Sequence, residues 1–232
     1  MSVNLARSLG SIVVGIAAAI VLVAVGVLVF LNPVWVGFEQ SRTHADLFTG
    51  YTIDDVHGVT NAVIGELIAG PATFLQAVGG AVVFDPRERQ HLADVRSVLL
   101  AFFGLVVVSG VVLVLMALRT RDRAWLWRSV GGSAAVLAGA VVVVGALFAL
   151  FFDAAFDLFH RLLFAGGSYT FDPSQERLVQ LFPEDFWAET SIALALVILV
   201  LAVATAWFGL RRAGGATVVR ERPSVATREA VS

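Results

Sequence analysis

Two histidines and three aspartates stand where long apolar runs meet polar sequence, and these residue types suit proton transfer. In the stretch DAAFDLFHRLLF at 153–164, Asp153, Asp157 and His160 fall within about 60° of one another on a helix. His91 has Asp94 one helical turn later. Histidine titrates near neutral pH, and a carboxylate beside one ring nitrogen fixes the tautomer and raises the basicity of the other. These residues predict a general base and a general acid for ester or acyl chemistry.

Two arginines beside the histidines each allow a functional and a structural interpretation. Arg161 either contacts a phosphate or a developing oxyanion, or pairs with Asp157 four residues earlier. Arg96 either contacts such an anion or extends to lipid headgroups. The histidines themselves could be interfacial polar residues at helix ends. We place Tyr169 and Trp187 in the aromatic belt of the membrane boundary.

Other catalytic chemistries have less support in the sequence. The chain has no cysteine, which excludes a thiolate nucleophile or metal ligand, and no GxSxG surrounds a serine. The HExxH and HxH spacings of zinc sites do not occur. His44 and His57 lack clear carboxylate spacing, and we assign them to the solvated surface. We expect no cofactor and no metal, and acyl transfer would pass directly between substrate groups.

Four apolar runs must position these residues. The chain has 232 residues, of which 58% are hydrophobic, against about 45–50% in soluble domains. Each run has roughly the 20 residues that cross a hydrocarbon core. The first run lacks a small-x-small cleavage site at its exit, so we expect a retained span. The sequence predicts an all-α integral membrane protein with a four-helix transmembrane bundle, whose spans are 9–31, 95–118, 130–152 and 190–210.

The distribution of charge predicts the orientation of the bundle. Ten of the 16 basic residues lie at one end: Arg7, four arginines in the 119–128 link and five after Leu210. The positive-inside rule therefore places both termini and this link in the cytoplasm, with the segments 32–94 and 153–189 as an extracytoplasmic helical cap. We expect residues 1–212 to form this membrane domain and residues 213–232 to be a disordered cytoplasmic tail.

Part of the expected cap has helical periodicity. Residues 51–70 predict an amphipathic helix on or near the membrane surface, with Thr52 as its N-cap. The next stretch, PATFLQAVGGAVVF, is interrupted by glycines and a proline. It predicts a re-entrant or interfacial piece, because a fifth span would spoil the charge asymmetry.

Two similar stretches, FDPRERQ at 84–90 and FDPSQER at 171–177, predict helix starts. In both, Asp can be the N-cap and Pro occupies N1, while Glu88 or Gln175 falls at N3, as in a capping box. The first helix would continue into the second span, and the second would end at Pro183.

Two longer stretches resemble the paired signatures of the four-span bacterial family of lipoprotein intramolecular transacylases. They are RERQHLADVRSVL at 87–99 and FDLFHRLLFAGGSYTFDPSQERLVQLFPEDFW at 156–187. Leucine follows the first histidine where the family usually has methionine, and YTFDP stands where a tryptophan is common. The matching residues are His91, Asp94, Val95 and Arg96 in the first stretch, and Phe159, His160, Phe171, Asp172, Pro173, Leu181, Pro183, Glu184 and Phe186 in the second.

The resemblance implies a transferase of the bacterial cytoplasmic membrane that acts on a diacylated lipoprotein among membrane lipids, without nucleic acid. The reaction would move the sn-2 acyl chain of the diacylglyceryl-cysteine onto that cysteine's own α-amino group and leave a lyso-form lipoprotein. His160, oriented by Asp157, would be the general base. His91, paired with Asp94, would be the general acid or would contact the oxyanion. The roles of the two histidines could be reversed. The alternatives are a non-catalytic lipid- or lipoprotein-binding membrane protein and a metal-dependent membrane hydrolase.

Overall fold

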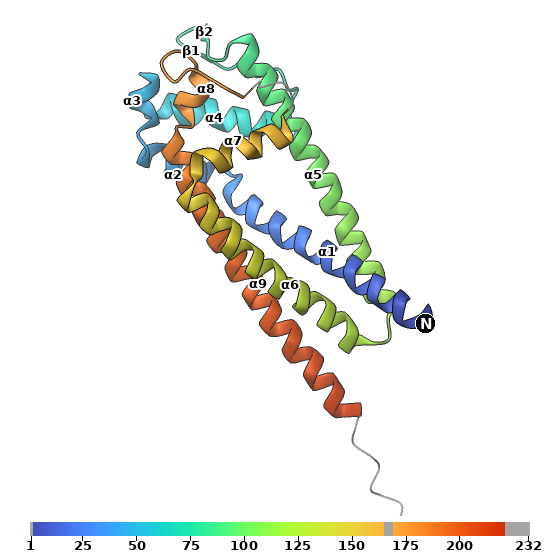
Figure 1. The fold of residues 1–232 in the computed structure, drawn as a ribbon. Helices are drawn as coiled ribbons and strands as arrows, with labels where there is room; N and C mark the ends of the chain where they lie inside the picture. Colours follow the sequence, from blue (N-terminus) through green and yellow to red (C-terminus); the bar gives the residue numbers. More distant parts are fainter. Residues whose placement is uncertain (1, 165–168, 221–232) are drawn as a thin grey trace, which may run out of the picture.

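In the part of the chain that the structure describes, four long helices carry the four apolar runs (Figure 1). The computed structural model describes residues 2–164 and 169–220. Each long helix has the length and hydropathy needed to cross a membrane, which confirms the predicted four-span fold. Every helix begins before its apolar run. The four are α1 (Ser2–Phe30), α5 (Pro86–Arg119), α6 (Arg123–Leu150) and α9 (Glu184–Arg220).

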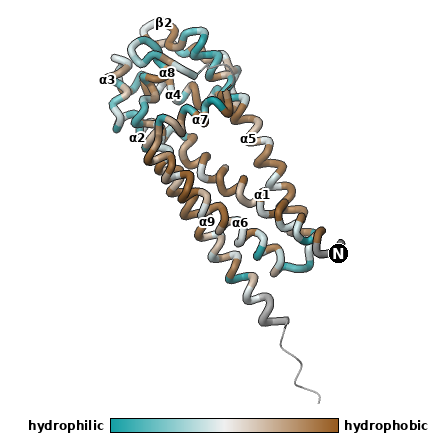
Figure 2. Tube along the Cα trace, viewed as in Figure 1, coloured by the Kyte–Doolittle hydropathy of each residue, from teal (hydrophilic) through white to brown (hydrophobic). Residues whose placement is uncertain are grey.

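The four long helices pack around α1 and around a close contact between α6 and α9. Figure 1 shows α1 between α5 on one side and the α6–α9 pair on the other. Gly131 of α6 and Gly209 of α9 permit the close contact, because a Cβ atom on Gly131 would lie 2.9 Å from the backbone nitrogen of Leu210. Most residues of the long helices are hydrophobic (Figure 2). Many of their large apolar side chains are exposed, as expected of surfaces that face lipid.

A helical cap covers one end of the bundle, and it is the most hydrophilic part of the molecule (Figure 2). Its core is formed by residues from segments far apart in the sequence, among them Val63, Phe74, Phe84 and Leu181. The predicted helical cap is thus confirmed as a structure, while its side of the membrane stays a prediction. The cap helices are α2 (Pro33–Arg42), α3 (Ala45–Thr49), α4 (Ile53–Ile68) and α8 (Arg177–Leu181).

Helix α4 is the amphipathic helix predicted over 51–70, and the Thr52 hydroxyl caps it by accepting a hydrogen bond from the Asp55 backbone N–H. The apolar face, with Val56 and Val63, is buried in the cap core, so it does not lie against a membrane surface. Helical periodicity defines an apolar face but does not identify what covers that face.

The predicted re-entrant piece is a short hairpin in the cap. Strands β1 (Ala77–Val78) and β2 (Ala81–Val82) pair antiparallel around Gly79 and Gly80. These glycines have φ of 59° and 83°, the left-handed conformation that a type I′ hairpin turn needs at both central residues. The glycines that suggested a broken membrane segment therefore make a turn.

The two FDP stretches have different outcomes. Asp85 and Glu88 form the predicted capping box, and α5 continues into the second span. At the second stretch the prediction is wrong, because the Asp172 carboxylate accepts from the backbone N–H and the hydroxyl of Ser174 and closes a turn. Helix α8 begins only after this turn and ends before Pro183, as predicted.

Helix α9 also revises the predicted tail. It continues to Arg220, so residues 213–220 are helical and not disordered. The apolar span has already nucleated this helix, and adding further turns to an existing helix costs less than starting a new one. Residues 221–232 lie outside the described part of the chain.

Candidate active site

The two candidate histidines meet where a short amphipathic helix, α7 (Phe152–Leu163), reaches the beginning of α5. Figure 1 shows α7 crossing between the cap and the long helices. His160 lies in the last turn of α7 and His91 near the start of α5. Their ring centroids are 6.2 Å apart with 26° between the ring planes. The fold thus brings together two residues that are far apart in the sequence.

Aromatic side chains enclose both imidazoles. Phe164 and Phe171 pack edge-on to His91 with centroid distances of 4.8 and 5.4 Å. Phe156 lies 4.1 Å from His160, and Tyr169 lies 5.0 Å from it. His91 keeps only 6% of its surface exposed. These contacts restrict the ring orientations and keep most water away from the pair.

The tautomer of His160 follows from its hydrogen bond. Nδ1 lies 2.8 Å from the carbonyl oxygen of Phe156. A carbonyl oxygen only accepts, so Nδ1 carries the hydrogen and the neutral ring keeps its lone pair on Nε2. Burial lowers the pKa of His160, against the opposing effects of the Phe156 carbonyl and the nearby Asp157 carboxylate. At neutral pH this ring is therefore a base with Nε2 available.

His91 has an unusual polar environment. Its Nδ1 is buried and has no hydrogen-bond partner among the residues that the structure describes. A buried nitrogen without a partner costs free energy, and such atoms in native proteins call for a structural or functional explanation. Because His160 lies beside this ring, a substrate group that reached the pair could supply the partner.

Two of the predicted carboxylate partners interact elsewhere. Asp94 accepts a hydrogen bond from the Gln90 side chain, at 3.0 Å, instead of binding His91. Asp153 faces the carboxyl group of Glu184 at the start of α9. Helical spacing places Asp94 and Asp153 on the expected faces, but other side chains lie nearer to their carboxylates than the histidines do.

Asp157 is also bound differently from the prediction. Its carboxylate pairs with Arg161 at 2.7 Å and accepts a hydrogen bond from the Tyr169 hydroxyl at 3.0 Å. Arg161 and Tyr169 hold the pKa of Asp157 below its usual value. The carboxylate therefore acts on His160 only through its charge, and the ion-pair interpretation of Arg161 is confirmed.

Arg96 has partners within the protein that the sequence did not suggest. Its guanidinium donates to the carbonyl oxygens of Glu66 and Gly70, and thereby ties α5 to the end of α4. The orphan carbonyls at a helix C-terminus suit a cation. Trp187 packs against Phe156 beside the site, so it supports α7 in addition to any boundary role.

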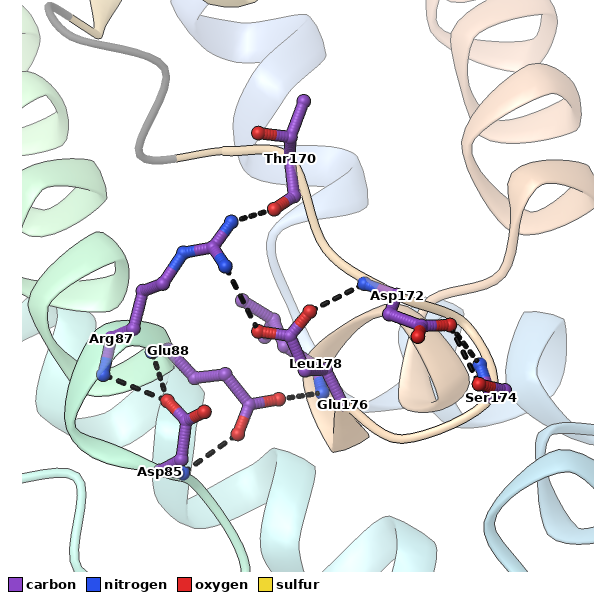
Figure 3. Close-up of polar contacts among 8 residues, drawn as sticks. All are labelled: Asp85, Arg87, Glu88, Thr170, Asp172, Ser174, Glu176 and Leu178. Carbon is purple, nitrogen blue, oxygen red and sulfur yellow. Dashed lines mark hydrogen bonds and ion pairs between the residues drawn. The ribbon is translucent and has the colours of Figure 1, made fainter.

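A polar network holds the segment 170–178 against α5 (Figure 3). The Arg87 guanidinium donates to the carbonyl of Thr170, pairs with Glu176 at 3.6 Å and lies 5.2 Å from the Phe171 ring centroid. Glu88 accepts from the Leu178 backbone N–H at 2.6 Å. The network places Phe171 against His91. The sequence patterns did not predict these contacts between segment 170–178 and α5.

The chain matches the family model described as "Lipoprotein intramolecular transacylase Lit" over residues 11–187. It belongs to this family. Solved structures of the membrane integral transacylase Lit from Bacillus cereus share its fold. In one, 18% of residues are identical and the TM-score is 0.73, with 93% of this chain and 99% of that chain covered. A variant of that protein with one histidine replaced by arginine gives 18% identity and a TM-score of 0.71, with 94% and 96% covered.

The chain is also similar to an uncharacterized protein of Aquifex aeolicus. The two are 26% identical over 133 residues, which is 56% of this chain. The chain spans 58% of the length of that relative. Family membership and the shared fold thus agree on a multi-pass membrane protein of an acyltransferase family.

The other two histidines of this Lit-family chain lie in the cap. His44 precedes α3 with a φ of 56°, in the left-handed region. His57 Nε2 lies 3.1 Å from the Ser41 hydroxyl, a contact that the sequence did not suggest. The hydroxyl donates to the Gly37 carbonyl at 2.9 Å, so its single hydrogen is engaged and His57 donates to it. This pair lacks the arrangement of an activated serine nucleophile.

Proposed function

We propose that this protein transfers the sn-2 acyl chain of a lipoprotein's diacylglyceryl-cysteine to the α-amino group of the same cysteine. The product is a lyso-form lipoprotein with an N-acyl group and a free sn-2 hydroxyl. The observation that carries the proposal is the stacked pair of His91 and His160 in a chain of the intramolecular transacylase family. Both groups that exchange the acyl chain belong to one substrate, so no protein nucleophile is required.

In the proposed reaction His160 is the base. The amino nitrogen attacks the ester carbonyl carbon, and its proton passes to Nε2 of His160. An α-ammonium group has a pKa of about 7.7–8.0, so a substantial fraction is free amine near neutral pH. The hydrogen bond from Nδ1 to Phe156 supports this role, because it leaves Nε2 with the lone pair.

His91 then acts on the tetrahedral oxygen or on the leaving sn-2 oxygen. Its N–H donates to the tetrahedral oxygen or protonates the sn-2 alkoxide as the C–O bond breaks and the amide C–N bond remains. The proton taken by His160 replaces the one given by His91, so each turnover leaves the pair with the same number of protons. The unpartnered Nδ1 of His91 supports this role, because a substrate group could supply the hydrogen-bond partner that the nitrogen lacks among the described residues.

Positioning supplies most of the rate enhancement in this scheme. The effective molarity of a well-oriented intramolecular attack reaches about 10⁵–10⁸ M. The aromatic side chains around the pair keep water from competing with the amine for the ester. Leu158, Phe159 and Leu162 on the outer face of α7 are exposed, and they offer the acyl chains an apolar surface.

We further propose that both termini lie in the cytoplasm and that the histidine pair faces the extracytoplasmic side. The arginines concentrated at the end opposite the cap support this orientation. Single cysteines test it directly, because the chain has none of its own. A cysteine at Ser41 should react with an impermeant thiol reagent in intact cells, and one at Arg121 should react only after permeabilisation. The reverse pattern would invert the orientation.

Mass spectrometry of a reporter lipoprotein tests the reaction. The reporter is expressed with the wild-type protein, His91→Ala or His160→Ala in cells that otherwise make the diacyl form. We expect a lyso N-terminus with the wild type and the diacyl form with both variants. His57→Ala, a histidine of the cap, is the matched control and should give the lyso product. Full activity in either site variant would refute the two-histidine mechanism, and an unchanged diacyl form with the well-expressed wild type would favour a lipid-binding protein.

A further inference from the structure

At the end of the bundle opposite the cap, α6 and α9 border an open hollow of about 620 Å³, within the range of about 300–1,000 Å³ typical of small-molecule sites. Three arginines and three aromatic residues line it: Arg123, Arg211, Arg212, Trp127, Trp207 and Phe208. We infer that this arginine hollow binds the phosphate headgroup of an anionic phospholipid. His160 is in α7 and His91 is near the start of α5. Figure 1 shows these elements at the cap end of the bundle, so the hollow is separate from the site of the proposed reaction.

Aromatic rings support two of the arginines. The Arg211 guanidinium lies 4.2 Å from the ring centroid of Trp207, and that of Arg212 lies 4.9 Å from Phe208. Phe208 in turn packs edge-on against Trp127 of the neighbouring helix at 5.5 Å. Stacking restricts each planar guanidinium, whose N–H groups suit the oxygens of a phosphate, so less entropy is lost on binding.

The positive charge of the hollow is not neutralised within the described part of the chain. None of its three arginines has a carboxylate within ion-pair distance there. The nearby acid, Asp122, pairs with Arg7 at 2.6 Å and caps α6 by accepting from the Trp125 backbone N–H. Arg123 donates to the carbonyl of Ala117 at 2.8 Å and keeps its other N–H groups for a ligand.

The hollow lies at the level along the membrane normal where lipid headgroups are expected. The apolar run of α9 ends at Leu210, directly before Arg211, and arginine and tryptophan together mark the boundary between hydrocarbon and headgroups. Val203 and Leu210 are exposed on the same helix and can contact acyl chains. Basic pockets between membrane helices at this level recognise anionic headgroups. Arginines needed only for membrane orientation would not have to converge from two helices on one hollow.

Lipid retention by the full-length protein in detergent tests the inference. Native mass spectrometry compares phosphatidylglycerol with phosphatidylcholine of the same acyl chains. We expect the wild type to retain phosphatidylglycerol preferentially, and each arginine removed from the hollow to weaken its retention about fivefold. The test variant is Arg123→Gln/Arg211→Gln/Arg212→Gln. The matched control, Arg119→Gln/Arg121→Gln/Arg128→Gln, removes the same charge at the same end but outside the hollow.

The outcomes separate a specific site from general attraction. Loss of the preference only in the hollow variant supports the site, whereas equal loss in both variants, or no preference in the wild type, would overturn it. Should the triple variant not fold, Arg211→Lys keeps the charge but removes the stacked fork and should still weaken retention. Displacement of the lipid by millimolar inorganic phosphate would show a free-anion site and overturn the lipid assignment.

Discussion

Replacement of Glu88 by glutamine tests whether the network beside the histidines is built on a carboxylate. The Glu88 side chain is 1% exposed. One of its oxygens accepts from the Leu178 backbone N–H at 2.6 Å, and the other accepts from the Asp85 backbone N–H at 2.7 Å. Glutamine has the same shape but only one acceptor oxygen. Its amide nitrogen would therefore face one of the two backbone N–H donors.

The expected cost of Glu88→Gln combines opposing contributions. A hydrogen bond to a charged group contributes about 1.5–3 kcal/mol, and a buried donor left without an acceptor costs about 1–3 kcal/mol. Removal of a buried charge relieves part of this cost. We expect a net loss of about 2 kcal/mol in the free energy of unfolding, which for a chain of this size lowers the Tm by roughly 4–8 °C.

Thermal unfolding in detergent, followed by circular dichroism, measures this change. Glu189→Gln is the matched control, because its carboxylate is 43% exposed and pairs with Arg42, and exposed ion pairs contribute about 0–1 kcal/mol. We also expect Glu88→Gln to lower transacylation, since the segment it binds carries Phe171. Equal Tm values for the two variants would refute the role of the Glu88 carboxylate.

Four further outcomes are expected. The His160 imidazole should stay neutral until the pH falls below its ordinary pKa of 6.5, and a midpoint above 6.5 in a histidine NMR titration would contradict this. Gly131→Val should separate α6 from α9 and lower the Tm, whereas Gly132→Ala, in open space, should not. Tyr169→Phe should reduce transacylation less than about tenfold, because Asp157 keeps its arginine partner. Activity should survive a metal chelator, and its loss would favour the hydrolase alternative.

Local sequence patterns predicted the features that depend on neighbouring residues. Apolar runs identified the four spans because a membrane imposes both length and composition on a helix. The capping box at Asp85 was correct because its partners lie within four residues. Thr52 at the start of α4 was correct for the same reason. Such patterns need no knowledge of what packs against them.

Features that depend on distant residues were predicted less well. Helical spacing placed Asp157 beside His160, but Tyr169 and Arg161 bind its oxygens. The two FDP stretches look alike, and only the first continues into a helix, because the Asp172 carboxylate is bound within its own turn. The capping-box pattern assigned one bond of Glu88 and not the other. Each difference comes from a partner that the local pattern could not include.

The distance between the two histidines sets a limit on the proposed chemistry. In the tetrahedral intermediate the amine nitrogen and the leaving oxygen share one carbon and lie about 2.4 Å apart. With a hydrogen bond of about 2.8 Å on each side, the imidazole nitrogens that serve them can be at most roughly 8 Å apart. The ring centroids are 6.2 Å apart, which lies within this limit. A larger separation would leave either the amine nitrogen or the leaving oxygen without an imidazole to exchange a proton with. The contacts that hold segment 170–178 against α5 therefore bear on the reaction as well as on stability.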